Sequence, residues 1–313
     1  MELVYQDLGQ GITCIETYYQ RPNLACCYML EDQGEVAFID TGTARTVPLI
    51  MALLERKGIS PGAVKYVMPT HVHLDHAGAT GQLMELFPNA QLIIHPYGAR
   101  HMIDPTKLIA GSIAVYGEEA FKRDYDELKA VEESRVIEAR DGYQVTLGQR
   151  KLLCLDTPGH ARHHLCFWDE QTQGFFTGDT FGISYPEFNT DQGGFVFLPT
   201  TPVQFDPDAW HQTLDRLMSY SPQRMYLTHF CRIEQTEAFA RELHRQIDDY
   251  VDIARNADPD HRYQSIHNGL NSYFRRKLEE HGCQLSDSEI EGLLELDLGL
   301  CAQGLEIWLQ RQA

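Results

Sequence analysis

The segment Thr70–Gly78, "THVHLDHAG", places three histidines and an aspartate close together. Its first residues end the apolar run "VKYVMPTH" at 64–71, which is typical of a buried strand that runs into a loop. In an extended chain the first two histidines, at i and i+2, point to the same side, and a turn can bring the other two side chains to a neighbouring point. Imidazole suits zinc and iron, and carboxylate is a natural bridging ligand. The segment therefore predicts a site for two metal ions, with the candidate ligands His71, His73, Asp75 and His76.

Five more apolar runs end in small or polar residues and predict buried strands, at 35–42, 90–96, 151–160, 174–179 and 224–229. Three of these runs end in the ligand residues His160, Asp179 and His229. Side chains at strand ends are positioned by a rigid sheet. Because the three lie far apart in the sequence, only folding can bring them to the first cluster. An aspartate shared by two metals would leave a bridging water, whose pKa the cations lower to about 7.

Helical patterns lie between some of these strands and indicate a layered α/β domain. Apolar faces predict helices near 47–54 and 83–87, and Pro207 marks the start of another. Two regions depart from the alternation. Residues 98–135 are charged and predict a helical insertion, and residues 235–313 predict about three helices, one of them opened by the capping box "SDSE". We therefore expect a catalytic domain at 1–234 and a C-terminal helical region at 235–313 that covers the active site.

Composition narrows the possible partners of this 313-residue chain. Its formal net charge of −19 repels phosphate backbones, which argues against nucleic-acid binding. No apolar run approaches the ~20 residues of a membrane span, and the first residues do not resemble a secretory signal. The eight cysteines include no CxxC and are typical of reduced thiols. We expect a cytoplasmic protein with a small-molecule substrate and no membrane partner.

Five motifs occur in the order found in the metallo-β-lactamase superfamily, and the chain resembles that family: "IDTG", "THVHLDHAG", "TPGH", "GDT" and "THF". The resemblance implies a four-layer αββα sandwich with a dinuclear site at one edge. It assigns His71, His73 and His160 to one metal, Asp75, His76 and His229 to the other, and Asp179 to a bridging position. It also implies that Asp40 orients the first cluster, and that His164 supports the ligands as in the glyoxalase II-like branch. His163 has no counterpart in the motif, and we expect it at the surface.

The residues at positions 73 and 179 narrow the choice among the branches of the superfamily. Residue 73 is His rather than the Glu of flavodiiron oxygen reductases, and residue 179 is Asp rather than the Cys of the main β-lactamase class. The chain is also too short for the extra domain of the nucleic-acid-processing enzymes. The expected C-terminal helices resemble those of glyoxalase II, and resemble still more those of the quinolone-signal response protein, a thioesterase-like relative with a helical C-terminus.

This resemblance predicts a metal-dependent hydrolase of an ester or thioester. A hydroxide bridging two divalent ions (zinc, iron or manganese) would attack the substrate, with Asp75 and Asp179 as the catalytic carboxylates. The charges of such a centre leave it slightly positive, which would stabilise a developing oxyanion. Two alternatives stay open: a phosphoesterase similar to the phosphorylcholine-esterase branch, and a regulatory protein that retains the metal site.

The sequence predicts the elements that face the substrate less specifically than it predicts the metal ligands. The long segment 181–207 is rich in aromatic residues, Gly and Pro, and such loops are often functional. It predicts an apolar substrate wall, or equally a set of rings packed under the C-terminal helices, formed by Phe181, Tyr185, Phe188, Phe195 and Phe197. The basic run 275–277 predicts either a site for an anionic substrate tail or a solvated helix face. The C-terminal helices also offer surface for a homodimer.

Overall fold

The computed structural model describes residues 1–200 and 203–312. Residues 201 and 202, inside the predicted substrate-facing segment, and residue 313 lie outside the described residues. The chain divides into two compact units. Unit 1 comprises 1–156, 163–178 and 223–232, and unit 2 comprises 157–162, 179–222 and 233–313. Residues 157–162 and 179–222 thus pack with the C-terminal helices, and the domain boundary expected after residue 234 stays a prediction.

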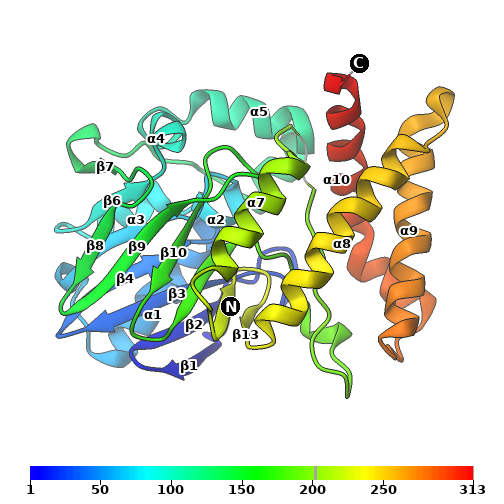
Figure 1. The fold of residues 1–313 in the computed structure, drawn as a ribbon. Coiled ribbons are helices and arrows are strands. Elements are labelled where there is room, and N and C mark those ends of the chain that lie inside the picture. Colours follow the sequence, from blue (N-terminus) through cyan, green and yellow to red (C-terminus); the bar gives the residue numbers. More distant parts are fainter. Residues whose placement is uncertain (201–202, 313) are drawn as a thin grey trace. The chain divides into compact units, whose positions relative to one another are not determined.

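Unit 1 contains a seven-stranded sheet whose strands follow the order of the sequence (Figure 1). The first four strands pair antiparallel, and the pairs from β4 to β7 are parallel. The strands are β1 (Tyr5–Gly9), β2 (Ile12–Glu16), β3 (Cys26–Asp32), β4 (Glu35–Ile39), β5 (Val64–Met68), β6 (Gln91–Ile94) and β7 (Val136–Glu138).

The second sheet has six strands in the order β13-β12-β11-β10-β9-β8. Strands β8 to β11 pair antiparallel, and β11 pairs with β12 in parallel. The strands are β8 (Gln144–Leu147), β9 (Arg150–Asp156), β10 (Leu165–Asp169), β11 (Gly174–Gly178), β12 (Arg224–Leu227) and β13 (Cys231–Ile233). All six strands expected from the apolar runs are confirmed, as β4, β5, β6, β9, β11 and β12.

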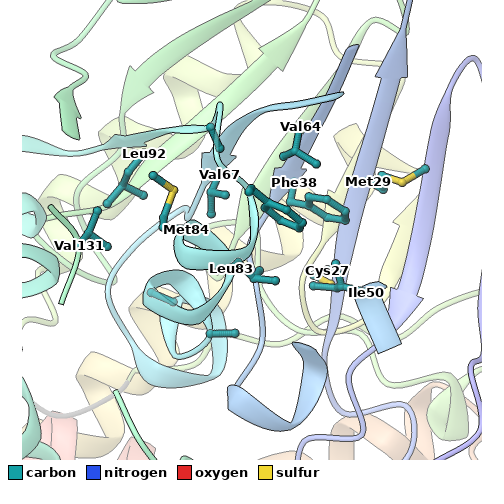
Figure 2. Packing of buried hydrophobic residues seen from close by; sticks show 14 of the residues in the cluster. Cys27, Met29, Phe38, Ile50, Val64, Val67, Leu83, Met84, Leu92 and Val131 are labelled. Carbon is teal, nitrogen blue, oxygen red and sulfur yellow. The ribbon is translucent and has the colours of Figure 1, made fainter. Parts of the chain in front are cut away.

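The continuous apolar run of β4 reflects burial on both faces. Val36 and Phe38 point into a core between the first sheet and its helices, while Ala37 and Ile39 point into a core between the two sheets. Figure 2 shows side chains of the helix-facing core, with Val64 and Val67 close to Phe38. The Phe38 ring stacks on Phe87 at a centroid distance of 5.6 Å. A strand buried on both faces loses the polar alternation of a surface strand, so its sequence reads as uniformly hydrophobic.

The helices of unit 1 include those predicted near 47–54 and 83–87. The segment expected as a helical insertion at 98–135 holds most of α4, all of α5 and α6, and a short 3-10 turn. The bounds are α1 (Val47–Lys57), α2 (Leu74–Ala77), α3 (Thr80–Leu86), α4 (Pro96–Ile103), α5 (Thr106–Tyr116) and α6 (Glu118–Asp124). Helix α1 ends at Gly58, whose φ of +67° suits glycine.

Unit 2 contains α7 (Pro207–Met218), α8 (Thr236–Arg255), α9 (Arg262–Glu280) and α10 (Asp287–Gln312). The predicted starts of two helices are confirmed. The Asp206 side chain accepts a hydrogen bond from the backbone N–H of Ala209, which caps α7. Ser286 and Glu289 exchange hydrogen bonds before α10, as a capping box requires. Among the described residues no helix is long and apolar enough to cross a membrane.

Candidate metal centre

Asp40 organises the site within unit 1 from a fully buried position just after β4. Its carboxylate accepts hydrogen bonds from the backbone N–H of Thr70 at 2.7 Å and from the Thr70 hydroxyl at 2.9 Å. It also accepts from the Thr228 hydroxyl at 2.6 Å and from Nδ1 of His76 at 2.9 Å. Because β5 and β12 belong to different sheets, this one carboxylate joins the loops that follow both.

Three ligand atoms converge beside Asp40. Nε2 of His76 lies 3.3 Å from Nε2 of His229, and Oδ2 of Asp75 lies 3.5 Å from the first nitrogen and 3.2 Å from the second. The opposite ring nitrogens are held elsewhere, since His76 Nδ1 donates to Asp40 and His229 Nδ1 donates to the carbonyl of Leu24 at 2.7 Å. Such bonds fix the tautomer and leave Nε2 as a lone-pair donor toward a cation.

His71 and His73 face each other next to this group. Nε2 of His71 lies 2.8 Å from Nδ1 of His73, and the His71 ring centroid is 4.1 Å from that of His76. The buried ring of His164 stacks on His71 at 4.8 Å, a position that suits the predicted supporting role. The expectation for His163 is wrong. Its side chain is buried, and its ring lies 6.1 Å from His71, because the turn that brings His164 inward carries its neighbour with it.

Unit 2 holds the other two predicted ligands together. Nε2 of His160 lies 3.3 Å from Oδ2 of Asp179, and His160 Nδ1 donates to the carbonyl of Pro199 at 2.9 Å. The arrangement repeats that of His76 and His229, with Nδ1 held by an oxygen and Nε2 directed at a carboxylate. The Trp210 ring meets His160 edge-on at 5.8 Å, and its Nε1 donates to the carbonyl of Thr180 at 2.7 Å. Trp210 therefore restrains both ligand-bearing segments.

Sequence reasoning missed three residues that position the ligands: Thr70, Thr228 and Trp210. For the two threonines a signal exists, because the dipeptide Thr-His ends both strand-like runs. Trp210 gave no such signal, since its position on α7 reads as an ordinary buried helix position. A φ of +136° at Gly159 and the approach of Trp210, which a Cβ there would meet at 2.6 Å, explain the glycine of "TPGH".

The donor set fits divalent metal ions. Imidazole nitrogens and carboxylate oxygens suit zinc, iron or manganese, and two groups of side chains that could hold a metal contain all seven predicted ligands. The Cys27 thiol of unit 1 does not compete with these nitrogen and oxygen atoms for a metal ion. Burial, with smaller contributions from Cys26 and Asp40, raises the pKa of the Cys27 thiol well above its usual value, so that it stays protonated.

The five aromatic side chains of the predicted substrate wall, Phe181, Tyr185, Phe188, Phe195 and Phe197, are all buried in unit 2. They pack against its helices. The Phe197 ring meets Phe274 of α9 edge-on at 5.3 Å, and the Tyr185 hydroxyl donates to the carboxylate of Asp297 on α10 at 3.0 Å. These contacts favour the alternative in which the rings support the helices, and a role as a substrate wall stays a prediction.

The basic run 275–277 is paired with carboxylates of the same unit. Arg275 lies 2.5 Å from Asp287, and Lys277 lies 3.5 Å from Glu242. Arg276 lies 3.9 Å from Glu280. This pairing favours the solvated helix face over a site for an anionic tail.

The order and geometry of these ligands match a known family. The profile of the metallo-beta-lactamase superfamily matches residues 22–229. The chain belongs to the metallo-beta-lactamase superfamily. Members are typically metal-dependent hydrolases, and the two groups of His and Asp side chains fit that chemistry. The sandwich of two mixed sheets with helices and a helical C-terminal part, predicted from the sequence, is thereby confirmed.

Individual members of the superfamily are distant from this chain. A metallo-beta-lactamase fold-containing protein of Sulfurisphaera tokodaii is 24% identical over 217 residues, which is 66% of this chain and 73% of that protein. The acyl-coenzyme A thioesterase MBLAC2 of Homo sapiens is 25% identical over 189 residues, covering 56% of this chain and 65% of that protein. A structure of a metallo-beta-lactamase family protein from Thermus thermophilus superposes with a TM-score of 0.68 at 19% identity, over 98% of this chain and 95% of that one. At that identity the match shows the fold alone.

Proposed function

We propose that this chain is a dinuclear metal-dependent hydrolase of an ester or thioester. The observation that carries the proposal is the convergence of Asp75, His76 and His229, with both imidazole Nδ1 atoms held by buried oxygens. Building such a group is unfavourable, because buried polar side chains need partners. A purely structural role would be served better by apolar residues, so the converging polar atoms indicate a cation.

We further propose the ligand sets implied by the superfamily motifs. His71, His73 and His160 would hold one ion, Asp75, His76 and His229 would hold the other, and Asp179 would bridge them. The equivalent orientation of His160 and His76, each with Nδ1 held by an oxygen, supports this assignment. Zinc, iron and manganese all suit these ligands.

When bound, two divalent cations would supply Lewis acidity and a water whose pKa they lower to about 7. The side chains of the protein would then transfer protons and orient the ligand rings. Asp75, whose side chain is 18% exposed, is the carboxylate of its group that can exchange a proton with solvent or with a leaving group. Asp40 keeps the His76 ring in one tautomer, and Leu24 does the same for His229.

An acyl substrate is supported by one distant relative, the human acyl-coenzyme A thioesterase. This likeness covers about half of the chain, so the bond hydrolysed has to be tested. Purified protein should be assayed with a thioester, a lactone and bis-p-nitrophenyl phosphate. Turnover of the phosphodiester alone would replace the proposed ester or thioester hydrolysis by the phosphoesterase alternative. A metal-loaded protein that turns over none of the three would favour the regulatory alternative.

The metal assignment can be tested by substitution. We expect His73→Ala and Asp75→Asn to bind fewer ions per chain, measured by inductively coupled plasma mass spectrometry, and to lose at least about 100-fold in kcat/KM. The control is His261→Ala, which removes a side chain that is 78% exposed. Wild-type metal content together with wild-type activity in both test variants would refute the proposed site.

A further inference from the structure

The loop between β2 and β3 has an unusual backbone. Three non-glycine residues within six positions adopt a positive φ: Tyr18 at +54°, Gln20 at +54° and Asn23 at +59°. The buried carboxylate of Glu16 holds the loop by accepting hydrogen bonds from the backbone N–H groups of Tyr18 at 2.7 Å and Asn23 at 2.8 Å. Such conformations are unfavourable, and in proteins they cluster where a ligand has to be held.

A cavity of about 360 Å³ opens beside this loop, within unit 1. Three parts of the chain form its wall: the loop itself, the turn after β4, and the end of α6. The lining residues are Tyr18, Tyr19, Gln20, Thr43, Arg45, Arg123 and Asp124. The hydroxyl groups of Tyr19 and Tyr125 share a hydrogen bond of 2.5 Å, which connects the loop to the region of α6. The wall is therefore joined across its separate segments.

The charges of the cavity favour an anion. Arg123 and Asp124 pair through two hydrogen bonds of 2.7 Å and cancel each other. The exposed Arg45 has no ion-pair partner among the described residues. The wall thus carries a net charge of about +1 in a protein whose formal net charge is −19, and a guanidinium binds carboxylate and phosphate groups well. The basic run 275–277, in contrast, is already paired with carboxylates.

The cavity wall is continuous with the supports of the metal ligands. Near its end the loop contains Leu24, whose carbonyl accepts a hydrogen bond from His229. On the other side, the backbone N–H of Ala79 donates to the carbonyl of Gly42 at 2.9 Å, and a Cβ at Gly78 would meet the Cα of Thr43 at 3.2 Å. A molecule bound in the cavity would therefore lie next to the segment that carries Asp75 and His76.

From this placement we infer that the cavity around Arg45 binds an anionic group of the substrate, a carboxylate or a phosphate, while the scissile bond lies at the metal ligands. The inference rests on the proposed hydrolase function and narrows its substrate class. An anion held by Arg45 would fix the substrate at a second point, and two-point binding lowers the entropy lost in reaching the transition state.

Matched substrates test the inference. Butyryl-coenzyme A, S-butyryl-3-mercaptopropionate and S-butyryl-N-acetylcysteamine share one thioester, and they carry phosphates, a carboxylate and no charge, respectively. We expect Arg45→Gln to lower the ratio of kcat/KM for the preferred anionic substrate over the neutral one by about tenfold, because a charge-assisted hydrogen bond is lost. The anionic substrate that loses more identifies the bound group. Arg140→Gln is the control, since its exposed side chain lies outside the cavity, and it should leave the ratio unchanged.

Binding of inorganic phosphate to the metal-loaded protein, measured by calorimetry, separates this inference from the hydrolase proposal. Weaker binding in Arg45→Gln than in Arg140→Gln, without turnover of any of the three thioesters, would support the anion site and refute the thioester part of the hydrolase proposal. An unchanged selectivity ratio in an active Arg45→Gln enzyme would refute the anion site and leave the hydrolase proposal standing.

Discussion

The metal-ligand loop of unit 1 and the aromatic segment of unit 2 differ in what their side chains do, although both suggested function from composition. In the loop, residues 71–76 direct nitrogen and oxygen atoms at common points, and the buried side chains of Thr70 and Asp40 hold the Nδ1 atoms of His71 and His76. In the segment, residues 181–197 direct rings at other rings and at the C-terminal helices. The difference shows that residue type alone does not mark a site. Polar atoms that converge while their other partners are fixed do mark one.

Substitution of Phe197 should have the largest effect on stability. This side chain is fully buried between Tyr185 and Phe274. Phe197→Ala leaves a cavity, and we expect the free energy of unfolding in urea to fall by about 3–5 kcal/mol. If the ring serves stability rather than the metal centre, folded Phe197→Ala should keep the wild-type number of metal ions per chain.

Phe195→Ala provides the matched control. Phe195 is 7% exposed and lines a cavity of about 280 Å³ in unit 2, so water can replace part of the lost ring. Its loss of stability should be clearly smaller than that of Phe197→Ala. If both variants instead kept full stability and lost selectivity among acyl chains, the rings would form a substrate wall, and the contrast between the two regions would break down.

Substitution of Asp40 should have the next largest effect, and on the metal rather than on the aromatic packing. In Asp40→Asn the side-chain amide can still accept from a threonine hydroxyl, but its NH2 group cannot accept the proton of His76 Nδ1. We expect metal affinity, measured by competition with a chromophoric chelator, to fall by about 10–100-fold. Asp7→Asn is the control, because it removes one exposed carboxylate whose bond is to the backbone of Gly9. Equal affinities in the two variants would contradict the orienting role of Asp40.

The sequence allowed the strands and the ligands to be predicted because both are local patterns. A run such as "EVAFIDTG" indicates burial on two faces and the turn that follows. In "HVHLDH" the spacing of four ligand residues is visible within one short segment. Long-range contacts were not predictable in the same way. The burial of His163 depends on how its turn meets His71 and His73. The choice between substrate wall and core for Phe197 depends on α9. Neither contact produces a periodic pattern of residues that a single sequence could reveal.

The prediction with the smallest expected effect concerns two histidines of unit 2, which resemble the metal site in composition only. Nδ1 of His211 lies 2.7 Å from Nδ1 of His244, and their Nε2 atoms face Asp248 at 3.2 Å and Asp215 at 3.3 Å. No common point is left for a cation. Burial lowers the pKa of His244, the neighbouring ring of His211 lowers it further, and the carboxylates of Asp215 and Asp248 oppose this. As pH falls from the unfolded-state pKa of about 6.5 toward the lower pKa of the folded state, the folded state binds fewer protons than the unfolded state, so stability should fall with pH over that interval.

We expect the urea midpoint of the wild-type protein to decrease between pH 7.5 and pH 5.5, and we expect His244→Gln to reduce that decrease while leaving metal content unchanged. The change should be modest, because the two side chains are 28% and 30% exposed. His261→Gln, at an exposed position, should behave like the wild type. Loss of a metal ion in His244→Gln would show that paired histidines and carboxylates bind metal in this protein even without convergence. A pH dependence identical to that of the wild type would show instead that unfolding does not change the pKa of His244. The metal ligands or other groups would then cause the loss of stability at low pH.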